Sequence, residues 1–275
     1  MDIICISSQV AYGPVGNSAA VPALEHAGFT VFQIPTTVLS NHPGHCPPAA
    51  TDVTAETIEK TLDILNQQNW LDRCGAVMTG YFRDQHQIVA AARAIADLKR
   101  RNPSLTYLCD PVMGDDHTDL YVPLPVADAI RDQLLPLADI ITPNRFELQW
   151  LTGTAVNGLE GAISAARSLA RPVTLATSLP ASPGHLQTAV IEHNRTAAVT
   201  TAHRPDTPHG AGDILSGLFL AAMLGGGPPP VLLGQVMASL EHILAASGET
   251  GALALPAALH GLDDLSALPV EISDD

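Results

Sequence analysis

The stretch "CGAVMTGYFRDQHQIVAAARAIADLKRRNPSLTYLCDP", residues 74–111, decides the fold class of this chain. It begins and ends with short apolar runs of the kind that form buried strands. Between them, residues 84–101 repeat apolar positions at helical spacing. Asp84 and Gln87 have the spacing of a capping box, and cations crowd the last turn of this segment. A strand, a helix and a second strand in this order predict a crossover unit with two parallel strands.

The same alternation continues on both sides of this unit. Further strands are expected at residues 2–8, 30–35, 139–144 and 172–178, with a hairpin formed by 188–194 and 196–204 whose turn is His193–Arg195. Helices are expected at residues 16–28, 54–67, 126–138, 145–153, 159–170, 213–224 and 231–247. Asn17 and Thr54 are the expected caps of the first two helices, and the tail "EISDD" is expected to fray.

Buried strands that alternate with helices predict a mainly parallel sheet covered by helices on both faces. We find no internal repeat and no clear linker, so residues 1–275 are interpreted as a single domain. In such sheets, ligands bind beyond the carboxyl ends of the strands. Candidate functional residues are therefore sought where each predicted strand ends.

Composition limits the class of partner. With 46% hydrophobic and 15% charged residues the chain is globular, and its net charge of −15 argues against nucleic acid or an anionic membrane as a partner. Small anionic ligands are not excluded, because a local dipole or metal ion can outweigh distant charge. Neither a signal peptide nor a membrane-spanning run is recognised. The four cysteines lack a C-x-x-C pair and are read as free thiols, which predicts a cytoplasmic location.

Acidic residues follow the strand that ends the opening stretch. Asp110 emerges at the strand end, and Asp115 and Asp116 come after the flexible Gly114. Several carboxylates at a ligand edge suit a hard divalent cation that carries phosphates. The alternative is a polar turn with solvated acids, which is the favoured interpretation for Asp116.

Polar residues at two later strand ends could likewise have either a structural role or a role in binding a ligand. Asn144 and Glu147 form a capping-box pattern, and the functional alternative is that both face a metal ion or its waters. Thr177 and Ser178 could hydrogen-bond phosphate oxygens or only satisfy a turn.

The run "HGAGDIL", residues 209–215, passes from glycine-rich sequence into a helical pattern. Gly210 and Gly212 allow close approach of a ligand, and the free N–H groups of a helix start favour an anion. Asp213 is then either a favourable charge on the helix dipole or a base beside an anion site.

The ends of the first strands supply candidate substrate contacts: Ser8, His42 and Tyr81. His42 and His45 are too loosely placed to be predicted as zinc ligands. No role is assigned to His26, His86 and His260.

Taken together, these motifs resemble the pyridoxal kinases of the ribokinase-like superfamily. The resemblance rests on "SSQVAYGPVGNSAA", "VLSNHPGH", "TGYFRD", "YLCDPVMGD", "YVP", "ADIITPNRFELQWLTG", "VTLATSLP" and "HGAGDILSGL", which occur in the family's order from about residue 3 to 245. It implies a three-layer α/β/α fold, ATP as co-substrate, Mg²⁺ and a homodimer, with K⁺ as a further candidate ion. The implied reaction transfers the γ-phosphate of ATP to the 5′-hydroxymethyl group of pyridoxal, pyridoxine or pyridoxamine.

The resemblance also implies roles for individual residues. Asp213 would take the hydroxyl proton, beside an anion hole formed by the N–H groups of Gly210, Ala211 and Gly212. Asp110 and Glu147 would organise Mg²⁺, directly or through water. The remaining implied contacts are Asp115, Thr142 and Asn144 near the metal, Thr177 and Ser178 on the ATP phosphates, and Ser8, Tyr81 and Tyr121 at the substrate pocket or lid.

The chain departs from the family pattern after His42, where Pro43 replaces a threonine and "GHCPPAAT" is short for the hairpin that covers the vitamin. Two other interpretations therefore remain open. One is a kinase for a related heterocycle such as hydroxymethylpyrimidine, although such kinases commonly carry cysteine in the anion-hole loop where this chain has Asp213. The other is a non-catalytic vitamer-binding protein on the same fold, against which the set Asp110, Glu147 and Asp213 argues.

Overall fold

The computed structural model describes residues 1–248 and 251–274, and within these residues ten strands form one central sheet. In chain order they are β1 (Asp2–Tyr12), β2 (Thr30–Asn41), β3 (Ala50–Asp52), β4 (Cys74–Thr79), β5 (Thr106–Cys109), β8 (Ile140–Ile141), β9 (Val173–Pro180), β10 (His185–Ile191), β11 (Arg195–Ala202) and β12 (Glu271–Asp274). Two short strands, β6 (Gly114–Asp115) and β7 (Asp119–Leu120), form a separate hairpin.

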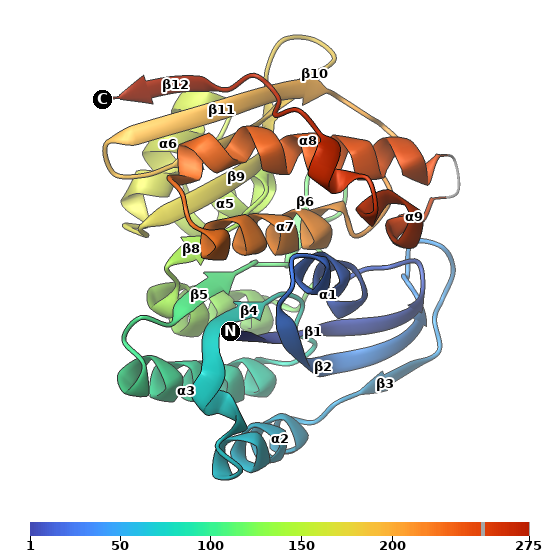
Figure 1. Cartoon of the computed structure of the whole chain (residues 1–275), viewed down its shortest axis with the longest axis vertical. Helices are drawn as coiled ribbons and strands as arrows, with labels where there is room; N and C mark the ends of the chain where they lie inside the picture. Colours follow the sequence, from blue (N-terminus) through green and yellow to red (C-terminus); the bar gives the residue numbers. More distant parts are fainter. Residues whose placement is uncertain (249–250, 275) are drawn as a thin grey trace.

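The strand order is β12-β11-β10-β9-β8-β5-β4-β1-β2-β3, so the sheet runs through the whole molecule (Figure 1). The central strands from β9 to β2 pair in parallel. At the two ends of the sheet, β10, β11, β12 and β3 pair antiparallel with their neighbours. The mainly parallel sheet is therefore confirmed, and the parallel part is the part that the crossover units build.

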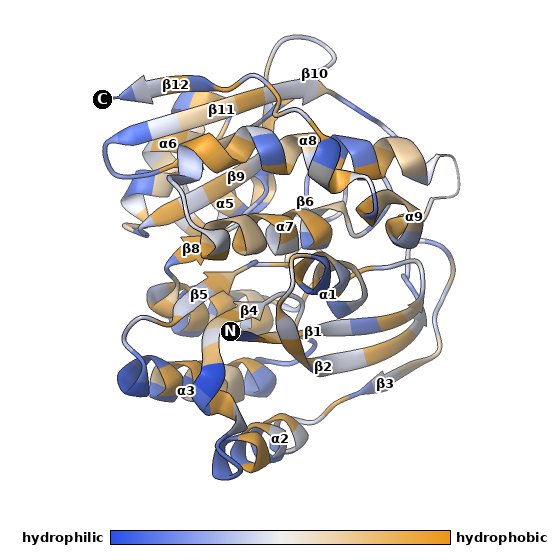
Figure 2. Ribbon diagram, in the orientation of Figure 1, coloured by the Kyte–Doolittle hydropathy of each residue, from blue (hydrophilic) through white to orange (hydrophobic). Residues whose placement is uncertain are grey.

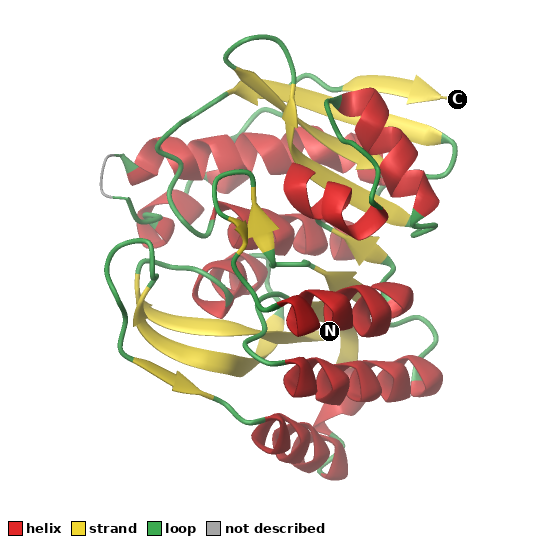
Figure 3. Cartoon of the chain, turned by 180° about the vertical axis from the view of Figure 1, so that it is seen from behind, coloured by secondary structure: helices red, strands yellow, loops and turns green. Residues whose placement is uncertain are grey.

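Helices cover both faces of the sheet, which gives three layers (Figures 1 and 3). One layer contains α1 (Asn17–His26), α7 (Ala211–Gly225), α8 (Pro229–Ser247) and α9 (Leu255–Leu259). The other contains α2 (Ala55–Gln67), α3 (Gln85–Arg101), α4 (Leu124–Ala129), α5 (Arg145–Thr152) and α6 (Leu159–Ser168). The α/β/α sandwich expected from the sequence is confirmed.

Strand β1 shows why both faces of the sheet are apolar (Figure 2). Ile3 and Cys5 pack in the core beneath α1, α7 and α8, whereas Ile4 and Ile6 pack in the core beneath α2 and α3. Successive side chains of a strand point to opposite faces, so a central strand covered on both sides is apolar at every position. The continuous run "IICI" is thus the local signature of a central parallel strand.

Helix α8 is the longest apolar helix among the described residues. Its length and hydropathy alone would allow it to cross a membrane, but 56% of its most apolar window is buried. It packs against β10, β11, α7 and α9. Its apolar composition therefore fits a core helix of this sandwich.

Two of the three expected helix starts are confirmed. Thr54 accepts a hydrogen bond from the backbone N–H of Thr57 at 3.1 Å, and Asp84 forms the expected capping box at the start of α3. The expectation for Asn17 is wrong, because Gly16 is the N-cap of α1. The buried Asn17 amide instead donates to carbonyl oxygens of β1 and β2, where it ties the two strands together.

Three further expectations are corrected. The strand expected at residues 30–35 continues to Asn41 as β2, and its end pairs with β3. The helix expected at 126–138 changes after α4 into a π-helical turn (Ile130–Leu134) and a 3₁₀ turn (Leu135–Leu137), because Pro136 has no N–H to continue an α-helix. The tail is not frayed over residues 271–274, which form β12 on the open edge of β11, and Asp275 lies outside the described residues.

The cysteines behave as free thiols. Cys5, Cys74 and Cys109 are buried in the strands, whereas Cys46 is exposed in the loop after β2.

Candidate active site

The carboxyl ends of the parallel strands meet at one edge of the sheet and carry polar side chains. Asp110 and Thr142 each directly follow a strand, whereas Thr177 lies within β9. The backbone N–H groups of all three continue the hydrogen-bond ladder to the neighbouring strand. The acceptors are the carbonyl oxygens of Thr79, Cys109 and Pro143, at 2.9, 3.2 and 3.0 Å respectively. The structure therefore brings Asp110, Thr142 and Thr177 together on adjacent strands.

A buried hydroxyl connects these strand ends to α7. The Oγ of Ser216 donates to Oδ2 of Asp110 at 2.9 Å and lies 2.8 Å from Oγ1 of Thr142. Ser216 is one helical turn after Asp213, so this contact holds the first turn of α7 against the strand ends. The sequence interpretation gave Ser216 no role, and its spacing of three residues from Asp213 was the one available signal.

The start of α7 is set by its glycine N-cap. Gly210 has a φ of 90°, and a Cβ atom there would collide with the carbonyl oxygen of Pro14. Both facts require glycine at this position. The tight turn places Asp213 in the first turn of the helix, beside the segment that joins β1 to α1, where it accepts a hydrogen bond from the backbone N–H of Gly16.

The N-terminus of α7 carries no side-chain cap. Gly212 is exposed, and a Cβ atom added to it would meet nothing within 4 Å. An uncapped helix start with open space in front of it presents backbone N–H groups and the positive end of the helix dipole to a ligand. The local geometry therefore suits an anion beside Asp213.

Three carboxyl groups occupy the site. Burial, followed by repulsion from Asp213, raises the pKa of Asp110 to about 7. Burial raises the pKa of Asp213 to about 6, against the opposing effect of backbone N–H groups. Burial and then the charge of Asp110 raise the pKa of Glu147 well above its ordinary value. Each group is thus held where its negative charge is poorly compensated.

The donor set fits a divalent cation shared with phosphates. Within the described part of the chain, no Lys or Arg side chain is among the influences on the pKa values of Asp110, Glu147 and Asp213. No group of three or more His, Cys, Asp or Glu side chains among the same residues forms a complete metal site by itself. A hard cation that takes one or two carboxylates and completes its shell with phosphate oxygens and water matches both observations.

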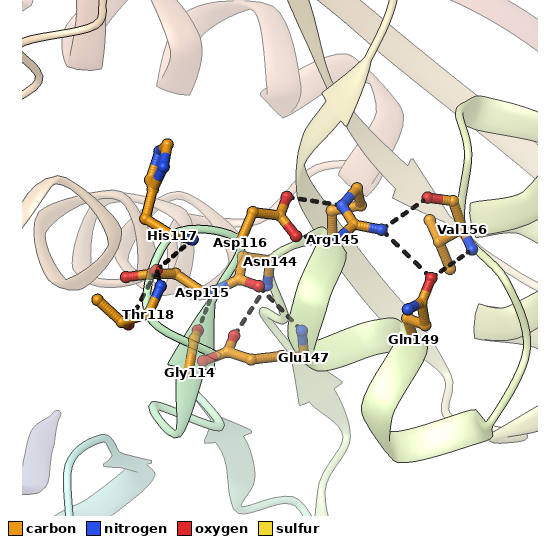
Figure 4. Close-up of polar contacts among 10 residues, drawn as sticks. All are labelled: Gly114, Asp115, Asp116, His117, Thr118, Asn144, Arg145, Glu147, Gln149 and Val156. Carbon is orange, nitrogen blue, oxygen red and sulfur yellow. Dashed lines mark hydrogen bonds and ion pairs between the residues drawn. The ribbon is translucent and has the colours of Figure 1, made fainter. Parts of the chain in front are cut away.

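Glu147 also caps α5 (Figure 4). Its Oε2 accepts from the backbone N–H of Asn144 at 2.9 Å, and its Oε1 accepts from the backbone N–H of Met113 at 3.0 Å. Asn144 completes the capping box with Oδ1, and its Nδ2 donates to the carbonyl oxygen of Gly114 at 2.8 Å. The structural role of this pair is therefore observed, and it fixes the loop that follows Asp110.

The hairpin of β6 and β7 lies next to the start of α5 (Figure 4). Asp115 accepts from the backbone N–H groups of His117 and Thr118, both at 2.8 Å, and so stabilises its own turn. Asp116 is exposed, as the sequence interpretation favoured, and it also forms a two-point ion pair with the guanidinium of Arg145. Arg145, which had no predicted role, thus anchors the hairpin to α5.

Thr177 and Ser178 lie on a bulge in β9 rather than in a turn after it. The pairing of β9 with β10 shifts register at this point, and Ser178 adopts a left-handed φ of 57°. A bulge places an extra residue in the strand and changes the direction of its side chains, which is common beside active sites. Both residues are at least partly accessible at this edge.

The predicted substrate contacts lie in different surroundings. Ser8 is buried against Gly16, where a Cβ atom would collide with its hydroxyl oxygen. The backbone of Tyr81 is fixed by the side chain of Ser7, whose Oγ accepts from its N–H at 3.0 Å. Tyr121 exposes 46% of its surface, but loss of hydration at its hydroxyl and then the charge of Glu147 raise its pKa well above the ordinary value. The negative charges of the site therefore act on its hydroxyl.

His42 belongs to a group of three histidine rings. Its ring stacks on that of His209 with centroids 3.9 Å apart, and His45 lies edge-on to both rings. Burial, and then the neighbouring His209 and His45, lower the pKa of His42 to about 4. His209, directly before the anion-hole glycine, was missed in the sequence.

The three-layer sandwich with a mainly parallel central sheet is the ribokinase-like fold that the sequence resemblance implied. The family model described as phosphomethylpyrimidine kinase matches residues 15–233. Among curated relatives, the pyridoxine/pyridoxal/pyridoxamine kinase of Bordetella bronchiseptica is 38% identical over 234 residues, which are 83% of each chain. The pyridoxal kinase PdxY of Leifsonia xyli is 32% identical over 257 residues, or 91% of each chain.

A solved structure shows the same similarity. Pyridoxal kinase from Leishmania donovani, in complex with ADP and pyridoxamine, superposes with a TM-score of 0.91 at 26% identity, and the match covers 99% of this chain and 98% of that one. The chain therefore belongs to the pyridoxal kinase family.

Proposed function

We propose that this chain transfers the γ-phosphoryl group of ATP to the 5′-hydroxymethyl group of pyridoxal, with pyridoxine and pyridoxamine as further acceptors. The observation that carries this proposal is the position of Asp213 in the first turn of α7, beside an uncapped helix start and near the buried carboxyl of Asp110. The named activities of the relatives and the ADP complex of the Leishmania enzyme support it.

Asp213 is the proposed base. As the hydroxyl oxygen of the acceptor bonds to phosphorus, its proton passes to the Asp213 carboxylate, and ADP leaves with the electrons of the broken bond. The backbone N–H groups of Gly210, Ala211 and Gly212 donate to the oxygens of the phosphoryl group in transit. Fixed dipoles of this kind stabilise the charge that spreads over those oxygens.

Asp110 and Glu147 would hold Mg²⁺, directly or through water, with Thr142, Asn144 and Asp115 orienting its surroundings. Mg²⁺ held there would neutralise the negative charge of the ATP phosphates. Both oxygens of Glu147 already accept backbone hydrogen bonds, from Asn144 at the start of α5 and from Met113, so a contact through water suits it better than direct ligation. Thr177 and Ser178, which lie on the bulge of β9, are the proposed contacts to the ATP phosphates.

Some features are proposed on the family resemblance. We infer a homodimer, a single kinase domain over residues 1–275, and a dependence on K⁺ that assays in potassium and sodium buffers would test. The free thiols, three of them buried, support a reducing cytoplasm as the location of the protein.

Phosphorylation of hydroxymethylpyrimidine is the second candidate, because the matching family model is described as phosphomethylpyrimidine kinase. One assay separates the two: purified protein, ATP and Mg²⁺ with pyridoxal, pyridoxine, pyridoxamine, hydroxymethylpyrimidine and ribose. We expect transfer to pyridoxal. Transfer to the pyrimidine alone would refute the proposed acceptor. Transfer to none of the five would refute the kinase, and pyridoxal binding without transfer would favour a vitamer-binding protein.

A further inference from the structure

The loop after β2 is docked onto the start of α7 through histidine rings. His42 and His45 belong to this loop, and His209 directly precedes the N-cap glycine of α7. The rings of His42 and His209 are stacked, with centroids 3.9 Å apart and an angle of 28° between their planes. His45 meets the ring of His209 edge-on at 5.7 Å.

The backbone of the loop fits closely around His209. The Nδ1 atom of His42 accepts a hydrogen bond from the backbone N–H of Gly44 at 3.1 Å, which sets the orientation of the His42 ring. Gly44 lies so close to His209 that a Cβ atom there would collide with Nε2 of His209. Two contacts therefore fix the position of the loop on His209: the ring stack with His42 and the close approach of the Gly44 backbone.

The far side of the loop contacts two other segments. His45 packs edge-on against Tyr12, the last residue of β1, with centroids 5.7 Å apart. A Cβ atom on Gly251, in the segment before α9, would lie 3.5 Å from Cε1 of His45. These contacts tie the loop to the end of β1, and the segment that follows β1 reaches Asp213 through the backbone N–H of Gly16.

We propose that His209 is a positioning residue that holds the short loop His42–Cys46 closed over the acceptor side of the site by stacking on His42. The inference rests on the proposed function, since it assigns the loop to the vitamin and not to ATP. In this chain the ring stack replaces the longer covering hairpin that the family resemblance led us to expect. Because His209 is covalently joined to Gly210, the stack fixes the position of the loop relative to the proposed anion hole.

The stack gives a specific kinetic expectation. His209→Ala should raise the KM for pyridoxal about five- to tenfold, the order expected for losing one aromatic contact, and leave the KM for ATP within about twofold of wild type. The dissociation constant of pyridoxal, measured by calorimetry without ATP, should rise by the same factor. His203→Ala is the matched control, because His203 is an exposed histidine of the same connecting segment.

A double-mutant cycle tests the pairing itself. If His209 acts by stacking on His42, the His42→Ala/His209→Ala double variant should bind pyridoxal no more weakly than whichever single variant has the lower affinity for pyridoxal. The inference would be overturned if the effects of the two single variants multiply in the double variant. It would also be overturned if His209→Ala raises the KM for pyridoxal and the KM for ATP equally, or leaves the KM for pyridoxal unchanged. Failure of the wild-type protein to phosphorylate any acceptor would instead refute the proposed function, so the two failures are distinguishable.

Discussion

At the scale of single residues, the site concentrates negative charge. Asp110, Glu147 and Asp213 are enclosed near one another, and burial raises the pKa of each. Such an arrangement costs stability and is therefore characteristic of functional sites. The carboxyl groups also differ in their surroundings. Glu147 is fixed by backbone N–H groups, whereas Asp213 is accessible enough to contact a substrate hydroxyl.

Replacing the proposed base should remove chemistry and spare binding. We expect Asp213→Asn to lower kcat by about 10²- to 10⁴-fold, because an amide cannot accept the hydroxyl proton. The dissociation constant of ATP, measured by calorimetry, should change little. Asp206→Asn, an exposed acid of the segment before α7, is the control and should keep full activity. Turnover close to wild type in Asp213→Asn would exclude this residue as the base.

The pKa of Asp213 also predicts the pH profile. Because burial raises this pKa to about 6, the carboxyl is protonated below that pH and cannot act as a base. We therefore expect kcat/KM at saturating Mg²⁺ to be constant above about pH 7 and to fall about tenfold per unit below pH 6. A profile that stays flat from pH 5 to 8 would contradict the assignment.

Some residues of the candidate site could be predicted from the sequence, and others could not. Asp213, Asp110 and Asn144 follow strands or start helices, and those signals are local. Ser216 could not be assigned in the same way, since its partners Asp110 and Thr142 are 106 and 74 positions away in the chain. Tertiary contacts of that separation leave no periodic trace in one sequence.

At the scale of elements, local rules located the parallel core but not its edges. The alternation of apolar strands with capped helices predicted the crossover units because each signal lies within about 20 residues. The bulge in β9 and the addition of β12 to β11 depend on the neighbouring strand, so they were missed. The extra length of β2 was missed for the same reason, since β3 pairs with its end.

The start of α7 offers a test that separates stability from function. A Cβ atom on Gly212 would meet no protein atom within 4 Å, so Gly212→Ala should leave the protein as stable as wild type or stabilise it by up to about 1 kcal/mol. We nevertheless expect kcat/KM to fall at least about tenfold, because the added methyl group would enter the space proposed for the phosphoryl group.

Gly225→Ala is the matched control for that variant. Gly225 is at the last position of the same helix, and a Cβ atom there also meets nothing within 4 Å. Thermal unfolding should show similar melting temperatures for the two variants, whereas steady-state assays should show loss of activity only in Gly212→Ala. Equal activity in both would mean that no ligand approaches Gly212.

At the scale of the whole molecule, the fold brings the segments proposed to contact substrates to one edge of the central sheet. The hairpin of β6 and β7 is anchored by Arg145, and the loop after β2 is anchored by His209. The charge of Asp115 in the hairpin acts on His209, so the two anchored segments border the same site. Under the proposed function, a chain with a net charge of −15 could accept ATP there because the helix start and a bound cation would dominate the local field.

The same buried acids predict how the metal-free protein responds to pH. The pKa of Asp110 is about 7 in the folded state, above its ordinary value of 3.8, so the folded state binds the proton more tightly than the unfolded chain. The resulting stability is fully present below about pH 4 and is lost as the pH rises through about 7. For a side chain that is only 6% exposed, the loss is on the order of 4 kcal/mol.

We therefore expect Asp110→Asn to be more stable than wild type at pH 8 in EDTA, and the difference to shrink as the pH is lowered toward 5. Urea unfolding at several pH values measures it, with Asp206→Asn as the exposed control that should follow wild type throughout. The same variant should bind Mg²⁺ with ADP more weakly, since it lacks a carboxylate that the cation would compensate. A wild type as stable as Asp110→Asn at pH 8 would show that the Asp110 charge is already compensated within the protein.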